Sequence, residues 1–279
     1  AVPDRSARTF RQAHMGVLTL PFLEAIAVGC LSGLVGTLMV LGNRVFFAES
    51  LSHGTFPGAV LGVVVANALG ANLSDGLMLG SVAVCIPLAI FMHYLGKVHG
   101  VSSTAAAGTT LTLGFAMGIL LLRWFQPLPL HVDSFLVGSL TTVNHRDVAV
   151  AAGLVIICLL AVLACRRRLF QAYFDPTTSP HSGLYDALTL GLICLTMAAV
   201  IPAVGTILSI ALLVAPAAGL RPWVSRPEAL LIGAGIIGIT IAVAGLFIAA
   251  HLSLSAGGTI AIVAGVFYLA SMTAYKAVS

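Results

Sequence analysis

Long stretches of the sequence contain no Lys, Arg, Asp or Glu, and this feature limits most strongly what the chain can fold into. The uncharged stretches are residues 25–43, 50–74, 76–96, 98–122, 148–165, 187–220 and 229–275. A helix needs about 20 mostly apolar residues to cross a bilayer, so the last two stretches are each long enough for two crossings. Only 8% of the residues are charged, whereas a soluble domain carries about 25%. The sequence therefore predicts an all-α, polytopic membrane protein.

The apolar stretches are continuous, as in "LIGAGIIGITIAVAGLFIAA" at 231–250. The strands of a membrane β-barrel would instead alternate polar and apolar residues, so a barrel is excluded. Small residues in "GAGIIGITIAVAG" at 233–245 predict a helix face that approaches another helix closely. The cysteines lie in or beside apolar stretches without a CxxC pair, which indicates core residues rather than a zinc or redox framework. They are Cys30, Cys85, Cys158, Cys165 and Cys194.

The apolar stretches predict about eight or nine transmembrane helices in one domain, residues 15–279. The expected spans are roughly 17–41, 55–70, 77–95, 104–122, 147–165, 186–204, 205–220, 229–250 and 258–275. Two of them, 55–70 and 205–220, are short for full crossings, so one of the two is a candidate re-entrant segment. Residues 1–14 are polar and are expected to form a tail, with Met15 as the natural start.

The basic residues predict the orientation of these spans. If nine helices cross and the C-terminus is cytoplasmic, the inner loops hold Arg44, Lys97, Arg166, Arg167, Arg168, Arg221, Arg226 and Lys276. The outer loops then hold only Arg123 and Arg146, apart from the arginines of the tail. This asymmetry follows the positive-inside rule. The net charge of +4 therefore reflects membrane topology and not nucleic-acid binding.

No motif in the sequence supplies energy or covalent chemistry. A phosphate-binding loop of the form G-x-x-x-x-G-K-[ST] is absent, and so are HExxH and GxSxG. The chain is therefore not expected to be an enzyme, and an intramembrane enzyme is a remote alternative. If the protein moves a solute uphill, the energy must come from a partner or from an ion gradient.

The stretch "FFAESLSHGTFPG" at 46–58 carries a carboxylate and an imidazole four residues apart. On a helix this spacing places Glu49 and His53 on one face. Ionisable residues inside a membrane usually line a pathway or pair with each other. One oxygen and one nitrogen ligand suit Mn(II), Fe(II) or Zn(II), although further ligands must come from elsewhere in the bundle, a second copy or water. The alternative is a structural ion pair or hydrogen bond near the membrane surface, beside Arg44.

Pro57 and Gly58 follow this pair and predict a helix break that keeps backbone exposed near a cavity. The longest polar stretch expected on the cytoplasmic side, from Arg166 to Asp186, contains two prolines and a glycine and is expected to be an irregular loop. Glu24, early in the first span, is expected at the membrane interface.

Several segments resemble, in the same order, the permeases of ABC transporters for manganese, zinc and iron. They are "GNRVFFAESLSHGTFPGAVLG", "TAAAGTTLTLGFAMGILLL", "FDPTTSPHSGL", "AVGTILSIALLVAPAAGL" and "LSLSAGGTIAIVAGVFYL". The resemblance covers nearly the whole chain from about residue 20. It implies a type II ABC importer-like permease in the cytoplasmic membrane of a bacterial-type cell.

The resemblance also implies roles for residues and partners. Glu49 and His53 occupy the positions of the metal ligands, although this family more often has Asp where this chain has Glu49. Phe174, Asp175 and Gly183 fall in the cytoplasmic segment, about 166–186, that docks on the ATPase, and Pro216 lies in a run that packs the transmembrane core. No permanently bound cofactor is expected.

The implied partners are a second copy of the chain, a cytoplasmic ATP-binding subunit that hydrolyses ATP, and an extracytoplasmic metal-binding protein. The alternative is a self-sufficient secondary carrier or channel for a metal or small solute. Such a carrier would be supported by inverted repeats with paired broken helices, and the sequence has no convincing internal repeat.

Overall fold

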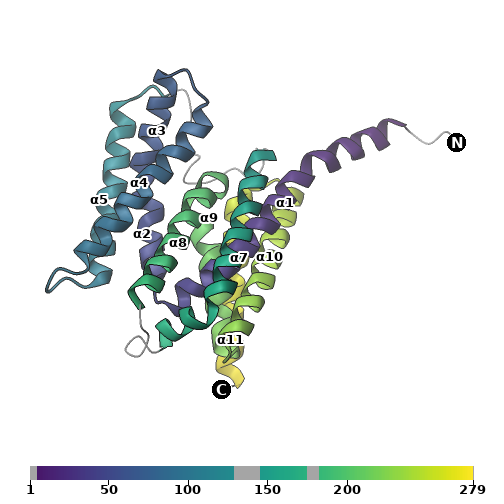
Figure 1. Ribbon diagram of the computed structural model, residues 1–279. Helices are drawn as coiled ribbons and strands as arrows, with labels where there is room; N and C mark the ends of the chain where they lie inside the picture. The colour runs from purple at the N-terminus through teal and green to yellow at the C-terminus, as the bar shows by residue number, and fades with distance from the viewer. Residues whose placement is uncertain (1–4, 129–144, 175–181, 279) are drawn as a thin grey trace.

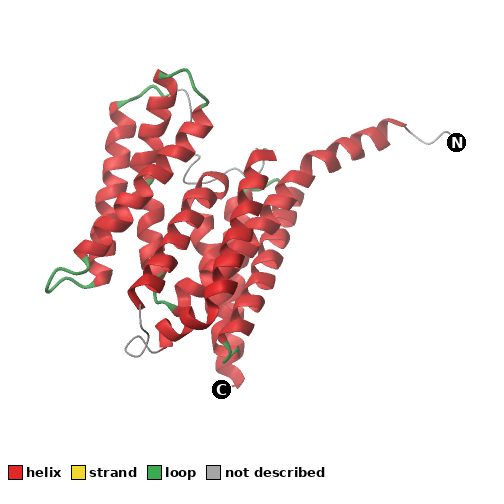
Figure 2. Cartoon of the chain, viewed as in Figure 1, coloured by secondary structure: helices red, strands yellow, loops and turns green. Residues whose placement is uncertain are grey.

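The chain is helical throughout the part that the structure, a computed structural model, describes: residues 5–128, 145–174 and 182–278 (Figures 1 and 2). These residues contain no β-strand, which confirms the all-α class. The α-helices are α1 (Arg5–Leu41), α2 (Val45–Gly54), α3 (Phe56–Ala68), α4 (Leu73–Leu95), α5 (Ser103–Trp124), α7 (His145–Phe174), α8 (Ser182–Val204), α9 (Thr206–Leu220), α10 (Pro227–Leu252) and α11 (Ala256–Val278). A short 3₁₀ helix, η2 (Arg221–Trp223), follows α9.

Seven helical segments among the described residues are long and apolar enough to cross a membrane. They are Thr19–Leu41, Val45–Ala68, Leu73–Leu95, Ser103–Trp124, Val148–Phe174, Pro227–Leu252 and Ala256–Val278. Two shorter apolar helices, Gly183–Met197 within α8 and Leu208–Trp223 across α9 and η2, account for the remaining expected spans. The helix α9 has 15 residues, about 22 Å at 1.5 Å per residue, and is therefore short for a full crossing, as predicted for 205–220.

Two boundaries differ from the prediction. The second span begins at Val45, not near residue 55, because α2 and α3, separated only at Thr55, together make up one span, Val45–Ala68. The expected irregular loop at 166–186 is also wrong in part, since α7 stays helical to Phe174 and α8 begins at Ser182. Leu169 and Phe170 are buried, and this burial extends α7 beyond the last residue of its apolar stretch.

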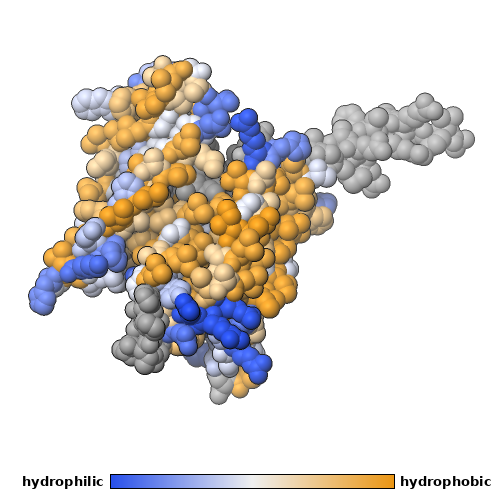
Figure 3. Space-filling view, viewed as in Figure 1, coloured by the Kyte–Doolittle hydropathy of each residue, from blue (hydrophilic) through white to orange (hydrophobic). Residues whose placement is uncertain are grey.

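Successive crossings alternate in direction, so the ends of α1, α4, α7, α9 and α11 lie on one side (Figure 1). That side carries the basic residues Arg44, Lys97, Arg166, Arg167, Arg168, Arg221, Arg226 and Lys276. Arg123 and Arg146 lie at the opposite side, where α1 also begins. Apolar residues form a band between hydrophilic ends (Figure 3). The positive-inside rule assigns the first side to the cytoplasm, and we call it the cytoplasmic end.

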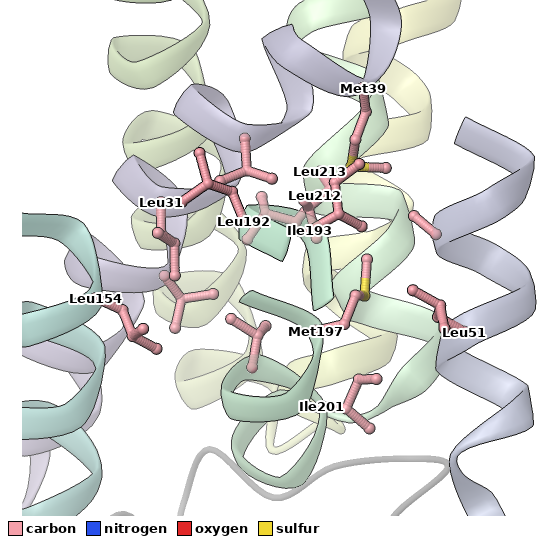
Figure 4. Close-up of a cluster of buried hydrophobic side chains, with 14 of the residues drawn as sticks. Leu31, Met39, Leu51, Leu154, Leu192, Ile193, Met197, Ile201, Leu212 and Leu213 are labelled. Atoms are coloured by element: carbon pink, nitrogen blue, oxygen red, sulfur yellow. The ribbon is translucent and has the colours of Figure 1, made fainter. Parts of the chain in front are cut away.

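Close helix pairs and one central helix hold the bundle together. A Cβ added to Gly29 of α1 would lie 2.7 Å from the Gly238 carbonyl oxygen of α10, so the predicted small-residue face does meet another backbone. The helix α8 lies in the middle of a buried cluster with side chains from α1, α2, α7 and α9 (Figure 4). Its residues Ile193, Met197 and Ile201 are fully buried.

Candidate metal-ion site

The helix α2 starts from a tight turn at the cytoplasmic end. Asn43 adopts a left-handed conformation with φ of 53°. The backbone N–H groups of Gly42 and Arg44 donate to the carbonyls of Leu38 and Met39, each at 2.8 Å. The Arg44 carbonyl then accepts the hydrogen bond from Ala48 that begins α2. The turn therefore fixes where α2 enters the membrane.

Glu49 and His53 lie one turn apart on α2, inside the span Val45–Ala68. Both side chains are half-buried, whereas most of the helix around them is buried. Leu51, roughly opposite the pair on the helix, points toward Met197 of α8 (Figure 4) and is fully buried. The bundle core thus holds one side of α2 and leaves the carboxylate and imidazole on its more open side.

The helix α5 packs against α2 beside His53. The imidazole meets the Phe115 ring edge-on, with centroids 5.7 Å apart, and Phe115 also contacts Phe56 at 5.9 Å. The backbones of α2 and α5 touch next to this contact, because a Cβ on Gly114 would lie 2.6 Å from the Gly54 Cα. A glycine pair and an aromatic ring therefore position the imidazole.

The hydroxyl groups around the pair donate hydrogen bonds to backbone carbonyls of their own helical segment. Ser50 donates to the Phe46 carbonyl at 2.8 Å, Ser52 to the Glu49 carbonyl at 2.8 Å and Thr55 to the Ser52 carbonyl at 3.1 Å. Across the described residues, no group of three or more His, Cys, Asp and Glu side chains is arranged to hold a metal ion. The described part of one chain therefore offers two candidate ligands here, a carboxylate and an imidazole, and not a closed site.

Arg44, the basic residue nearest to the pair in the sequence, forms its ion pair with Asp186 of α8. Its Nη2 donates to both carboxylate oxygens of Asp186, at 2.8 and 2.9 Å. This ion pair joins the start of α2 to the first turns of α8, at the cytoplasmic end. The ion pair of Arg44 is therefore made with α8, and the structural alternative for Glu49 and His53 stays open.

The residues predicted near the pathway are buried in helix contacts. The break between α2 and α3 falls at Thr55, and Pro57 is in the first turn of α3, where a missing N–H costs little. Pro57 and Gly58 are both buried, and Gly58 packs against Gly80 and Val84 of α4. Pro216 is buried inside α9.

The predicted ATPase-coupling residues flank a part of the chain outside the described residues. Phe174 is the last residue of α7 and is 64% exposed. Gly183 is exposed near the start of α8, and a Cβ added there would meet nothing within 4 Å. Asp175 lies outside the described residues. Both described residues thus present open surface at the cytoplasmic end.

Sequence reasoning missed three residues and misplaced one. Asp186 and Tyr173 contact the start of α2, and Phe115 contacts His53. Of these residues, only Asp186 is marked in the sequence, because it is a single acidic residue at the edge of a long uncharged stretch. Glu24, expected at the membrane interface, is 1% exposed and belongs to the interior of the bundle.

The cysteines follow the prediction of core residues. Cys85, Cys158 and Cys194 are buried, Cys30 and Cys165 are half-buried, and all five are free thiols. Cys85 donates to the Cys194 carbonyl at 3.6 Å, which ties α4 to α8. They contribute packing rather than a site.

Comparison with known proteins agrees with this architecture. The chain is 26% identical over 248 residues to the manganese transport system membrane protein MntC of Halalkalibacterium halodurans, covering 88% of this chain and 82% of MntC. It is 28% identical over 250 residues to the zinc transport system membrane protein TroC of Treponema pallidum, covering 86% and 83% of the two chains.

A solved structure and a family profile extend the likeness over the whole bundle. A chain of PsaBC from Streptococcus pneumoniae, solved in complex with Fab, superposes with a TM-score of 0.78 at 26% identity, covering 91% of this chain and 90% of that one. The profile of the ABC 3 transport family matches residues 15–275. The chain therefore belongs to the ABC 3 transport family and is a membrane-spanning permease, not an enzyme.

Proposed function

We propose that this chain is the permease subunit of a type II ABC importer that carries a divalent transition-metal ion, manganese, zinc or iron, across the cytoplasmic membrane. The observation that carries the proposal is the half-buried Glu49–His53 pair inside a membrane span. An oxygen and a nitrogen ligand suit these metals. Relatives named as manganese and zinc transport proteins support the same cargo.

The working unit is a homodimer in which each copy contributes one Glu49–His53 pair. An ionisable side chain that faces lipid costs several kcal/mol, so the open side of α2 needs a protein surface against it. A second copy related by a two-fold axis would meet this need and would supply four ligands instead of two. The described residues of one chain contain no group of three or more such side chains that could hold a metal ion, and this supports a site completed by a second copy.

Two further subunits complete the transporter. A cytoplasmic ATPase binds around Phe174, Asp175 and Gly183, and the open surface of Phe174 and Gly183 supports this assignment. An extracytoplasmic metal-binding protein delivers the ion to the opposite end. The metal is cargo, and ATP acts only through the partner subunit.

Transport follows from weak and transient coordination. The ion arrives at the outer end, exchanges part of its water shell for Glu49 and His53, and leaves when the helices rearrange. A site that held the ion with many fixed ligands would slow its release. A self-sufficient carrier is disfavoured, because the family match covers residues 15–275 of the chain.

The test is uptake of radioactive manganese and zinc in cells that express the full transporter. Glu49→Gln and His53→Ala are each compared with wild type at matched membrane levels. Each change is expected to lower uptake of the cargo metal roughly tenfold or more. Removing a residue that only hydrogen-bonds to a metal ligand already lowers metal affinity about 10–100-fold, and these changes remove a proposed ligand itself.

Matched controls are Glu228→Gln and His251→Ala, an exposed acid and an exposed imidazole at the two ends of α10. Both controls are expected to transport normally. Wild-type uptake that survives both changes at the pair would make Glu49 and His53 structural. A wild-type transporter that moves neither metal would contradict the proposed function itself.

A further inference from the structure

Arg44 and Asp186 join two parts of the chain that have different tasks in the proposed transporter. The Arg44 Nη2 lies 2.8 and 2.9 Å from the two Asp186 carboxylate oxygens, and the two residues are 142 positions apart. Arg44 starts the helix with the metal ligands, and Asp186 lies near the start of α8, which follows the ATPase-facing segment. The contact therefore connects these two places directly.

On the α2 side, Arg44 is part of the helix that carries the ligands. Its backbone N–H is bonded to Met39 and its carbonyl to Ala48, so the residue moves with the first turn of α2. Glu49 is five residues further and His53 nine, which is about 7.5 and 13.5 Å along a helix that rises 1.5 Å per residue. A displacement of Arg44 therefore reaches both ligands through one rigid helix.

On the other side, Asp186 belongs to a helix that is packed into the core of the bundle. Ile193, Met197 and Ile201 of α8 are fully buried among side chains from the surrounding helices (Figure 4). Close-packed interiors transmit displacement rather than absorb it. A displacement of the cytoplasmic end of α8, where Asp186 lies, is therefore expected to be transmitted along the helix and through Asp186 to Arg44.

A second contact couples α7 to the same turn. The Tyr173 hydroxyl is hydrogen-bonded to Thr189 of α8 at 2.5 Å. Its ring lies against the turn that precedes α2, because a Cβ added to Gly42 would come within 3.0 Å of the Tyr173 Cε1. The helices on both sides of residues 175–181 thus contact the start of α2.

We infer that the Arg44–Asp186 ion pair is the positioning link through which the ATPase-facing ends of α7 and α8 set α2 and its metal ligands. This inference rests on the proposed function. Both side chains are 31% exposed. A pair so accessible to water and salt adds little to folding stability. Its geometry therefore points to a role in positioning, and its loss is expected to change coupling while leaving assembly intact.

The test uses the full transporter with its ATPase in proteoliposomes and measures manganese uptake per ATP hydrolysed. Arg44→Gln and Asp186→Asn are each expected to lower this ratio about tenfold, with ATPase binding and thermal stability unchanged. The double neutral variant is expected to lose no more than either single variant, because both break the same link. Arg44→Asp with Asp186→Arg is expected to recover part of the ratio.

The matched control is the looser ion pair at the opposite end of the bundle, Arg146 with Asp75, at 3.8 Å. Arg146→Gln and Asp75→Asn are expected to leave the ratio unchanged. Normal coupling in both single variants, or losses that multiply in the double variant, would overturn the inference. A wild-type transporter that carries no metal would instead show that the proposed function has failed.

Discussion

The surroundings of Glu49 and His53 decide what these two residues can do. The nearby hydroxyl groups of Ser50, Ser52 and Thr55 donate to carbonyls of their own helix. The side chains left to interact with water or with a transported ion are therefore the carboxylate and the imidazole. The imidazole is also oriented, since Phe115 holds it edge-on.

This orientation gives a prediction for Phe115→Leu, which keeps an apolar side chain but removes the ring. Aromatic pairs contribute about 0.5–1.5 kcal/mol beyond area burial, so the KM for the metal is expected to rise about two- to tenfold. Metal-uptake kinetics at matched expression check the change. Phe247, which meets His251 edge-on at 5.1 Å, provides the control. An unchanged KM in Phe115→Leu would show that the ring does not position His53.

The candidate pair could be selected from the sequence because ionisable residues are rare in an apolar chain and a four-residue spacing places two side chains on one face of a helix. The partners of the pair could not. Phe115 looks like any other apolar residue of its span, and its contact with His53 depends on how α5 packs. Arg44 pairs with Asp186 across 142 positions, a distance at which residue spacing carries no information.

At the scale of the helix, α2 shows why spans were predicted well and boundaries less well. The apolar stretches located all the long crossings, but the second one was expected near residue 55 rather than at Val45. Glu49 and His53 lower the local hydropathy, so the part of the span before Phe56 resembles a loop in the sequence. Similarly, the three arginines at 166–168 made the last turns of α7 resemble a loop in the sequence, although Leu169 and Phe170 are buried there.

The contact between α2 and α5 gives a prediction at this scale. Gly114→Ala would force a Cβ to within 2.6 Å of the Gly54 Cα, and overpacking of this kind costs about 1–3 kcal/mol. The variant is expected to lose thermal stability, measured as the fraction of monodisperse protein that remains after heating in detergent.

The matched control for that experiment is Gly153→Ala in α7, where an added Cβ meets nothing within 4 Å. Alanine suits a helix better than glycine, so this control is expected to be neutral or slightly stabilising. Equal stability of the two variants would contradict the close contact between α2 and α5.

At the scale of the whole molecule, the proposed function divides the bundle into a part expected to face the partner ATPase and a part expected to meet the ion. The buried helix α8 lies between them and contacts α2 through Leu51 and Met197 (Figure 4). The side of α2 that carries Glu49 and His53 is only half-buried within one chain. The proposed homodimer completes it, and the proposed ion pathway then follows the two-fold axis.

The most direct measurement is the number of manganese ions bound by the purified, dimeric transporter in nanodiscs without ATP, counted over a series of metal concentrations. The account predicts one ion for every two copies of the chain, with binding lost in both Glu49→Gln and His53→Ala. One ion for each copy, or binding that both substitutions leave unchanged, would contradict the claim that two copies share one site built from Glu49 and His53.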